Sequence, residues 1–209
     1  MLRSDIDSFI KSIPNNVKVI AATKYISSSE IEELYNHNIK DYGENRVDSF
    51  LEKYQALYKY KDIKWHFIGH LQRNKAKEVI NKIDYLHSLD SLKLADIIEK
   101  LREVPLKTFV EVSINLEESK NGVPYYEIES FISSLLKYQK IELVGLMMMA
   151  VKGSLNTEEQ FNKLREIRDS LERKFNIKIP YLSMGMSDDY LSAIKAGATH
   201  IRLGRILYK

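Results

Sequence analysis

Short apolar, β-branched runs alternate along the chain with longer stretches in which apolar residues recur every three or four positions. The short runs predict strands, and the longer stretches predict helices with one buried face. Eight strands result, each separated from the next by a helix, at residues 17–23, 39–43, 65–69, 83–89, 106–114, 141–149, 181–184 and 199–204.

The ends of the predicted helices carry recognisable signals. Ser27 and Glu30 have the spacing of a capping box, in which each side chain bonds the backbone N–H of the other residue. Thr157 begins a later helix by the same pattern, and Pro124 suits the first turn of another. Gly197 ends the last helix, where a glycine is a common cap.

This order of elements predicts one domain, residues 1–209, folded as a (β/α)8 barrel of TIM type near the lower size limit for such barrels. An additional N-terminal helix, residues 2–12, would cover the side of the barrel that lacks a helix after the eighth strand. An open, doubly wound sheet is the competing architecture. The eightfold count favours the closed barrel.

The composition constrains the compartment and the partners. Charged residues make up 29% of the chain with a net charge of +3, and no basic stripe is interleaved with aromatics, so nucleic acid is not an expected partner. The absence of cysteine excludes disulfides, thiolate catalysis and cysteine metal sites, and it suits a reducing cytosol. No signal-peptide core is found, and the longest apolar run, 144–151, is far shorter than the roughly 20 residues of a membrane helix. We therefore expect a soluble, cytoplasmic protein that does not engage a membrane.

In barrels of this kind, functional side chains lie at the carboxyl ends of the strands. Five of the predicted strands end in polar or glycine-containing segments. In chain order these segments are Lys24; 43–46; His66 and His70; 183–187; and Arg202, Gly204 and Arg205.

The ends of the seventh and eighth strands predict a phosphate site. Such sites are commonly built in these barrels from the loops after these two strands and a helix N-terminus. Ser183 and Ser187 offer hydroxyl groups, Gly185 and Gly204 permit close approach of the backbone, and Ser187 opens the next predicted helix. In the alternative interpretation Gly185 is a plain turn and Ser187 only an N-cap. The two aspartates that follow Ser187 support this alternative, because they already complement the helix dipole.

Lys24 is the candidate for covalent chemistry. A lysine at the end of a buried strand is costly unless its ammonium is paired or its pKa is depressed. A neutral amine can form an imine with a carbonyl, so a phosphate site across the same barrel mouth suggests a Schiff base with a phosphorylated aldehyde. The alternative is a lysine that extends from the barrel mouth into solvent.

Arg202 is in phase with His200 and Gly204, so its side chain is expected to face the barrel axis and to need an acceptor there. A pyridine nitrogen is one candidate acceptor, and the carboxylate of Glu111 is the other. His66 and His70 are not expected to bind zinc, because their spacing suits a metal site only on a helix.

Six segments carry a family resemblance: 21–24, 43–45, 65–75, 117–122, 182–187 and 201–204. At these residues the sequence resembles the YggS/PROSC family of pyridoxal phosphate homeostasis proteins, over nearly the whole chain. The resemblance implies a barrel like the N-terminal domain of bacterial alanine racemase, with pyridoxal 5′-phosphate held as an imine on Lys24. It also implies that Asn45, His66 and Ile68 lie near the ring, that Arg202 faces the pyridine nitrogen, and that Ser183, Ser187 and the Gly204 segment hold the phosphate. Met186 and Arg205 complete the predicted cofactor-binding set.

Two residues depart from the family pattern. Met148 stands where members often carry a small residue, and it would either reshape the pocket or pack outside it. Arg205 stands near a position where a small or hydroxyl residue is common. It would either add positive charge near the phosphate or contribute only its backbone.

We expect the protein to bind pyridoxal 5′-phosphate and to take part in vitamin B6 and amino-acid homeostasis, without robust catalysis. Racemisation needs an acid or base on each face of the substrate, and related enzymes obtain one from a second domain that is not seen in this sequence. An arginine at the pyridine nitrogen also weakens the ring as an electron sink. A pyridoxal-phosphate-dependent amino-acid racemase is the alternative, and a colourless Schiff-base aldolase is a third reading. The expected partners are pyridoxal phosphate and apo-enzymes that receive it, with the protein a monomer or weak dimer.

Overall fold

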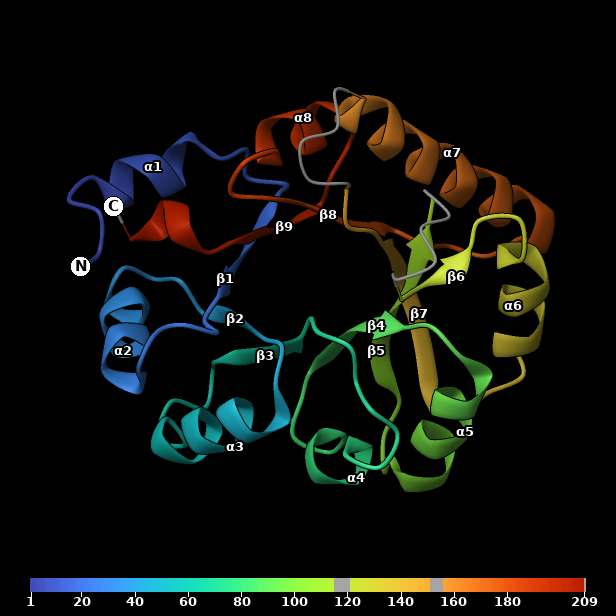
Figure 1. Cartoon of the computed structure of the whole chain (residues 1–209), viewed down its shortest axis with the longest axis horizontal. Helices are drawn as coiled ribbons and strands as arrows, with labels where there is room; N and C mark the ends of the chain where they lie inside the picture. Colours follow the sequence, from blue (N-terminus) through green and yellow to red (C-terminus); the bar gives the residue numbers. More distant parts are fainter. Residues whose placement is uncertain (115–120, 151–155, 209) are drawn as a thin grey trace.

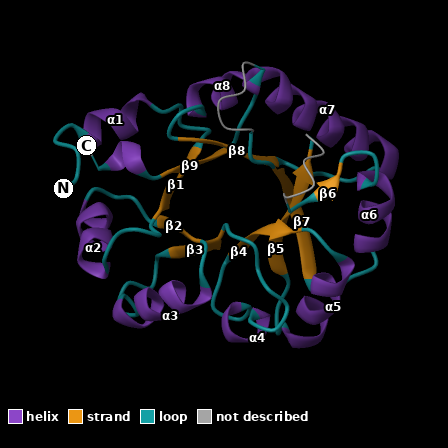
Figure 2. Ribbon diagram, viewed as in Figure 1, coloured by secondary structure: helices purple, strands orange, loops and turns teal. Residues whose placement is uncertain are grey.

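The computed structural model of the protein describes residues 1–114, 121–150 and 156–208. Among these residues, eight parallel strands form a ring with helices around it (Figures 1 and 2). The barrel strands are β1 (Lys18–Ala22), β2 (Asp41–Glu44), β3 (Lys64–Phe67), β4 (Tyr85–Leu89), β5 (Leu106–Ser113), β7 (Ile141–Met147), β8 (Tyr181–Met186) and β9 (His200–Leu203). The helices are α1 (Ile6–Ser12), α2 (Ser28–Asn36), α3 (Val47–Ala56), α4 (Ala76–Val79), α5 (Leu92–Leu101), α6 (Ile128–Leu135), α7 (Thr157–Phe175), α8 (Tyr190–Lys195) and the 3-10 helix η1 (Arg205–Leu207).

Strand pairing closes the barrel and confirms the predicted (β/α)8 fold. The order around the ring is β4-β3-β2-β1-β9-β8-β7-β5, and β4 also pairs with β5. An open, doubly wound sheet would leave two free edges, so the competing architecture is wrong. The carboxyl ends of all eight strands therefore meet at one mouth, as parallel pairing requires.

Apolar side chains form two separate layers. The larger layer fills the space between the strands and the surrounding helices, whereas Phe109, Val144 and Met147 pack inside the barrel. Met147 and Met148 are neighbours in sequence and point to opposite faces of the sheet, as successive strand residues do. Met148 is buried in the outer layer, so this departure from the family pattern packs outside the barrel interior.

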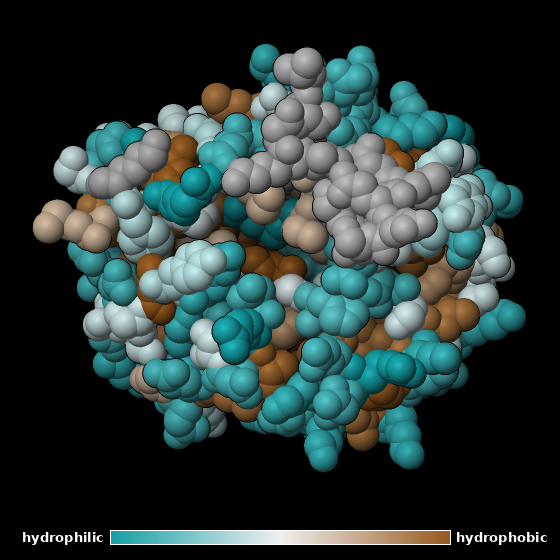
Figure 3. Space-filling model, viewed as in Figure 1, coloured by the Kyte–Doolittle hydropathy of each residue, from teal (hydrophilic) through white to brown (hydrophobic). Residues whose placement is uncertain are grey.

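The N-terminal segment covers the side of the barrel beside η1, as the sequence predicted (Figure 1). The backbone N–H of Arg3 donates to the carbonyl of Leu207 at 3.1 Å, and Ile6 and Phe9 of α1 are buried. No helix in the described part of the chain is long and apolar enough to cross a membrane. Hydrophilic side chains cover most of the face seen in Figure 3, with smaller apolar patches among them.

Two predicted helix starts are wrong, a third helix has its cap one residue earlier than predicted, and the capping box is right. Ser27 and Glu30 form both reciprocal hydrogen bonds at the start of α2. Pro124 instead ends a short strand, β6 (Val123–Pro124), which pairs with β5 and precedes α6. A proline is tolerated in such an edge strand because its missing N–H is not needed for pairing. Thr157 is the first residue of α7 rather than its cap, a position that Asn156 takes.

The second wrong helix start matters for the site. The predicted helix at Ser187 begins only at Tyr190, because β8 continues to Met186 and Asp189 takes the cap position. The Asp189 carboxylate accepts a hydrogen bond from the backbone N–H of Met186 at 2.6 Å and so holds the turn between β8 and α8. Ser187 therefore lies in this turn and not at a helix N-terminus. Gly197 ends α8 with a φ of +96°, as predicted.

Candidate functional site

A cavity of about 890 Å³ opens at the mouth, beside the carboxyl ends of β1, β8 and β9. It brings together six of the residues that the sequence predicted for cofactor binding. These are Lys24, Met186, Ser187, Arg202, Gly204 and Arg205. The cavity is also lined by Ala22, Tyr25, Ile26, Glu30, Asp188, Ile206 and Tyr208.

Lys24 lies in a tight turn that connects β1 to α2. The backbone N–H of Ile26 donates to the carbonyl of Thr23 at 3.2 Å, which makes Lys24 and Tyr25 the two central residues of the turn. The Lys24 side chain is exposed, and its ammonium lies 4.3 Å from the centroid of the Tyr25 ring. The prediction that Lys24 is buried at the end of a strand is therefore wrong, because the lysine lies just beyond the end of β1 and is exposed. Its place in the cavity is as predicted.

Ser187 and the backbone after β9 form a cluster of polar groups on the facing wall. Ser187 Oγ accepts hydrogen bonds from the N–H groups of Gly204, at 3.2 Å, and Ile206, at 3.5 Å. Arg205 is exposed and forms an ion pair of 2.6 Å with Asp188. A Cβ atom placed on Gly204 would meet Ala22 of β1 at 3.7 Å, an ordinary van der Waals contact. These N–H groups and the Arg205 guanidinium can donate hydrogen bonds to an anion.

Arg202 is buried between the cavity and the barrel interior, with 4% of its surface exposed. Its guanidinium donates to Ser183 Oγ at 2.7 Å and to the carbonyl of Met148 at 2.9 Å. Burial lowers the pKa of Arg202 to about 10, and the negative charge of Glu111 opposes this shift. Within the described part of the chain, Arg202 and Glu111 form no ion pair. The predicted carboxylate partner therefore affects the pKa of Arg202 only through its charge.

Four of the ten predicted site residues do not line the cavity: Asn45, His66, Ile68 and Ser183. His66 and Ser183 are fully buried inside the barrel. The Ile68 side chain packs on Gly43, where a Cβ atom would lie 2.8 Å from Ile68 Cδ1. The structure therefore divides the predicted set between the cavity wall and the layer beneath it.

Asn45 has an unsatisfied polar atom. Its Oδ1 is buried and has no hydrogen-bond partner among the described residues. Gly69 packs against the Asn45 backbone so closely that a Cβ atom on Gly69 would lie 2.4 Å from the Asn45 carbonyl oxygen. A buried acceptor without a donor is rare in folded proteins and calls for a partner that the described residues do not supply.

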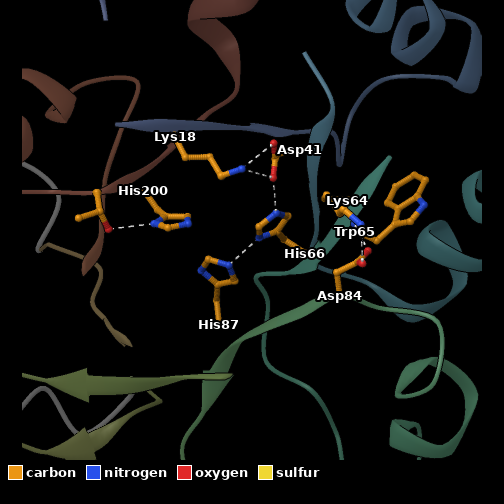
Figure 4. Close-up of polar contacts among 9 residues, drawn as sticks. Lys18, Asp41, Lys64, Trp65, His66, Asp84, His87 and His200 are labelled. Atoms are coloured by element: carbon orange, nitrogen blue, oxygen red, sulfur yellow. Dashed lines mark hydrogen bonds and ion pairs between the residues drawn. The ribbon is translucent and has the colours of Figure 1, made fainter. Parts of the chain in front are cut away.

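A hydrogen-bonded chain runs through the barrel interior to Arg202, and Figure 4 shows its first three members, Asp41, His66 and His87. Asp41, which begins β2, contacts His66 Nε2 at 3.0 Å and forms an ion pair with Lys18. His66 Nδ1 contacts His87 Nε2 at 2.9 Å, and His87 Nδ1 contacts Ser183 Oγ at 2.9 Å. Ser183 therefore lies beneath Arg202, where it orients the guanidinium.

The donor of each hydrogen bond in this chain can be assigned from the groups at its two ends. The Asp41 carboxylate only accepts, so His66 donates to it from Nε2 and, as a neutral ring, accepts at Nδ1. His87 then donates from Nε2 and accepts the Ser183 hydroxyl hydrogen at Nδ1. This assignment needs both rings to be neutral, which agrees with burial lowering the pKa of His66 and, more strongly, that of His87.

The sequence did not point to several residues that support the site. Lys53 and His87 received no role, and Glu44 was noted only as part of a motif. A signal existed for Lys53, because it falls on the apolar face of α3 that Val47 and Phe50 also form. A charged residue on a buried helix face needs a buried partner.

The buried Glu111 makes the stability of the folded protein depend on pH. Burial raises the pKa of Glu111 to about 7, the Asp90 carboxylate adds to this shift, and Arg202 opposes it. Because the pKa of Glu111 in the folded protein lies above the ordinary value of 4.5, the stability contributed by protonated Glu111 is full below that value and is lost as the pH rises through 7.

We expect Glu111→Gln to remove this loss. The free energy of unfolding of the variant minus that of the natural protein should be roughly 2–3 kcal/mol larger at pH 8 than at pH 4.5. Urea unfolding at both values measures this difference, with the exposed Glu142→Gln as the control. Burial lowers the pKa of His200 to about 3, so the stability contributed by neutral His200 is lost as the pH falls below its ordinary pKa of 6.5. This effect is the same in the natural protein and in both variants. An equal free-energy difference at both pH values would contradict the expectation.

Comparisons with known proteins show the family to which the chain belongs. The family model described as "Alanine racemase, N-terminal domain" matches residues 2–209. The "Pyridoxal phosphate homeostasis protein" of Aquifex aeolicus is 40% identical over 199 residues, which cover 93% of this chain and 87% of that protein. The human protein of the same name is 33% identical over 207 residues, covering 91% of this chain and 75% of its own length.

Solved structures extend the comparison. PipY of Synechococcus elongatus PCC7942, solved with PLP bound, superimposes with a TM-score of 0.91 at 29% identity, covering 98% of this chain and 100% of that chain. An alanine racemase of Clostridium difficile gives a TM-score of 0.79 at 17% identity, covering 99% of this chain and 57% of the racemase. The second likeness concerns the fold alone.

Proposed function

This chain belongs to the pyridoxal phosphate homeostasis proteins, within the wider family of the alanine racemase N-terminal domain, and from that premise we propose that it binds pyridoxal 5′-phosphate as a Schiff base on Lys24. One observation carries the proposal. A single cavity is lined by a lysine on one wall and by the donors around Ser187 and Gly204 on another. An aldehyde and a phosphate on one small molecule match these two features.

Two features of the cavity lining, and one residue outside it, fit the cofactor. The N–H groups around Ser187 suit the phosphate, and Arg205 can exchange Asp188 for it. Arg202 has five N–H groups, and the two recorded hydrogen bonds leave others free for the pyridine nitrogen. Asn45 Oδ1 is a buried acceptor that still needs a donor near this mouth.

The chemistry asked of Lys24 is simple and balanced. The neutral amine of Lys24 attacks the aldehyde carbon, a C=N bond replaces the C=O bond, and the aldehyde oxygen leaves as water. No electrons are transferred to an outside acceptor. When bound, pyridoxal phosphate supplies an electrophilic carbon and a conjugated ring.

We propose homeostasis without robust catalysis. Arg202 is held from below by Ser183 and from the side by the Met148 carbonyl, so its positive charge is fixed beside the cavity. That charge disfavours protonation of a facing pyridine nitrogen and so weakens the ring as an electron sink. The relatives are named for homeostasis and not for a reaction. Apo-enzymes that accept the cofactor are the proposed recipients. An amino-acid racemase is the alternative function.

Borohydride reduction followed by mass spectrometry of peptides tests the proposal. A pyridoxyl adduct on Lys24 is the expected result. An adduct on Lys75 in place of Lys24 would overturn the assignment, because Lys75 does not line the cavity. A protein with no visible absorbance and no adduct would favour the aldolase reading.

The phosphate wall gives a separate prediction. Ser187→Ala removes a hydroxyl that faces the cavity, and a lost hydrogen bond to a charged group is worth about 1.5–3 kcal/mol. Retention of pyridoxal 5′-phosphate is therefore expected to weaken about 10- to 150-fold, whereas imine formation with phosphate-free pyridoxal should be nearly unchanged. Visible absorbance during titration with each aldehyde measures both. Ser192→Ala, within α8 and outside the cavity lining, is the matched control. Equal losses for the two aldehydes would show that Ser187 is not at the phosphate.

A further inference from the structure

A buried carboxylate lies next to the turn that carries Lys24. Glu44, the last residue of β2, has no exposed surface. Its Oε1 accepts from Thr23 Oγ1 at 2.5 Å and from Lys53 Nζ at 2.6 Å, and its Oε2 accepts from Ser49 Oγ at 3.0 Å. Both oxygens are therefore used, and all their partners come from the chain itself.

Lys53 extends this cluster to the backbone. It projects from α3 with 6% of its surface exposed, and its Nζ donates to the carbonyl of Thr23 at 2.6 Å as well as to Glu44. The backbone N–H of Thr23 also donates to the carbonyl of Gly43 at 3.0 Å. Thr23 is thus held through its N–H, its hydroxyl and its carbonyl group.

The residue held in this way is the one that precedes Lys24. The Thr23 carbonyl that receives the Lys53 ammonium is also the acceptor that closes the turn around Lys24 and Tyr25. At the other end of the turn, the capping box of Ser27 and Glu30 anchors the start of α2. Both ends of the short segment that presents Lys24 are therefore fixed by side chains.

Stability alone does not account for this arrangement. Removing two charges from water costs several kcal/mol per ion, and a buried ion pair is often no more stabilising than apolar residues of the same volume. The pair lies where backbone placement matters most, because a displacement of about 1 Å at a reacting group can slow a reaction about 100-fold.

We propose that Glu44 and Lys53 are positioning residues that fix the Thr23–Ile26 turn and thereby aim Lys24 into the cavity. This inference rests on the proposed Schiff base at Lys24. It assigns to the buried pair a role in imine formation through the backbone, without contact with the cofactor.

The double variant Lys53→Met with Glu44→Gln tests this role. Both replacements keep approximate shape and leave no unpaired buried charge, so the barrel is expected to fold. The matched control is Lys59→Met with Glu32→Gln, which removes an exposed ion pair of 2.9 Å from neighbouring elements. Amide hydrogen exchange without cofactor is the first measurement. We expect the N–H groups of Thr23 and Ile26 to exchange about tenfold faster or more in the double variant, with the other strands unchanged.

The second measurement is the rate of imine formation with pyridoxal and with pyridoxal 5′-phosphate. Both rates are expected to fall about 10- to 100-fold in the double variant and to stay unchanged in the control. A merely structural pair would leave the rate in the folded protein unchanged, and that outcome, together with unchanged exchange, would overturn the inference. Failure of the Schiff base itself would show as the absence of a Lys24 adduct in the natural protein, a separate result.

Thr23→Val gives an independent arm if the double variant does not fold. This replacement keeps the shape of the side chain and removes only the hydroxyl that donates to Glu44. We expect slower imine formation with both aldehydes and faster exchange at Ile26. Rates equal to those of the natural protein would contradict the proposed role.

Discussion

Replacing Lys24 by alanine is expected to abolish covalent attachment of pyridoxal 5′-phosphate and the visible absorbance that accompanies it, while the barrel remains folded. Lys24 is the one lysine among the described residues that line the cavity, so no neighbouring amine is placed to replace it. Its side chain is exposed and its recorded partner is the Tyr25 ring, so its removal breaks no buried contact.

Absorbance spectra and borohydride-trapped adducts measure the loss, and far-ultraviolet circular dichroism reports the fold. Lys75→Ala is the matched control, since Lys75 also lies between a strand and the next helix, at the N-cap of α4, and is outside the cavity lining. Undiminished absorbance in Lys24→Ala would refute the assigned site. Loss of circular dichroism would instead show that Lys24 has a structural role.

The second large effect is expected on stability. Lys53→Met alone leaves the Glu44 carboxylate buried without its cation, and breaking a buried pair in this way costs about 3–5 kcal/mol. Restoring neutrality with Glu44→Gln in the same chain should recover most of that loss. The free energy of unfolding in urea, measured for both variants, gives the difference directly.

The exposed Lys59–Glu32 pair provides the comparison. Its side chains are 65% and 36% exposed, so Lys59→Met should change the free energy of unfolding very little. If Lys53→Met and the double variant were equally destabilised, the loss would come from packing around Lys53 and not from an unpaired charge. That result would leave the pair without the electrostatic role described above.

The hydrophobic pattern by itself determined the fold. Apolar runs and amphipathic stretches follow from local geometry, since strand and helix residues face the core at fixed periods. Once eight strands alternate with helices, closure into a parallel barrel brings all carboxyl ends to one mouth. Lys24, Ser187, Arg202 and Gly204 could therefore be assigned to one place before any distance was known.

The tertiary structure decided which predicted residues reach the cavity and which lie beneath it. A strand that continues two residues further moves Ser187 from a helix N-terminus into a turn, and the side on which Ser183 points depends on strand register. The sequence has no local mark for such a register.

Long-range pairing lay further beyond the sequence. His87 and Ser183 meet although 96 positions separate them, and Lys53 reaches back 30 positions to the Thr23 carbonyl. Local periodicity identifies the buried face on which Lys53 stands, but it does not identify the acceptor. The partner of a buried charge is set by how the barrel closes, and only the three-dimensional packing brings Lys53, Glu44 and Thr23 together beside Lys24.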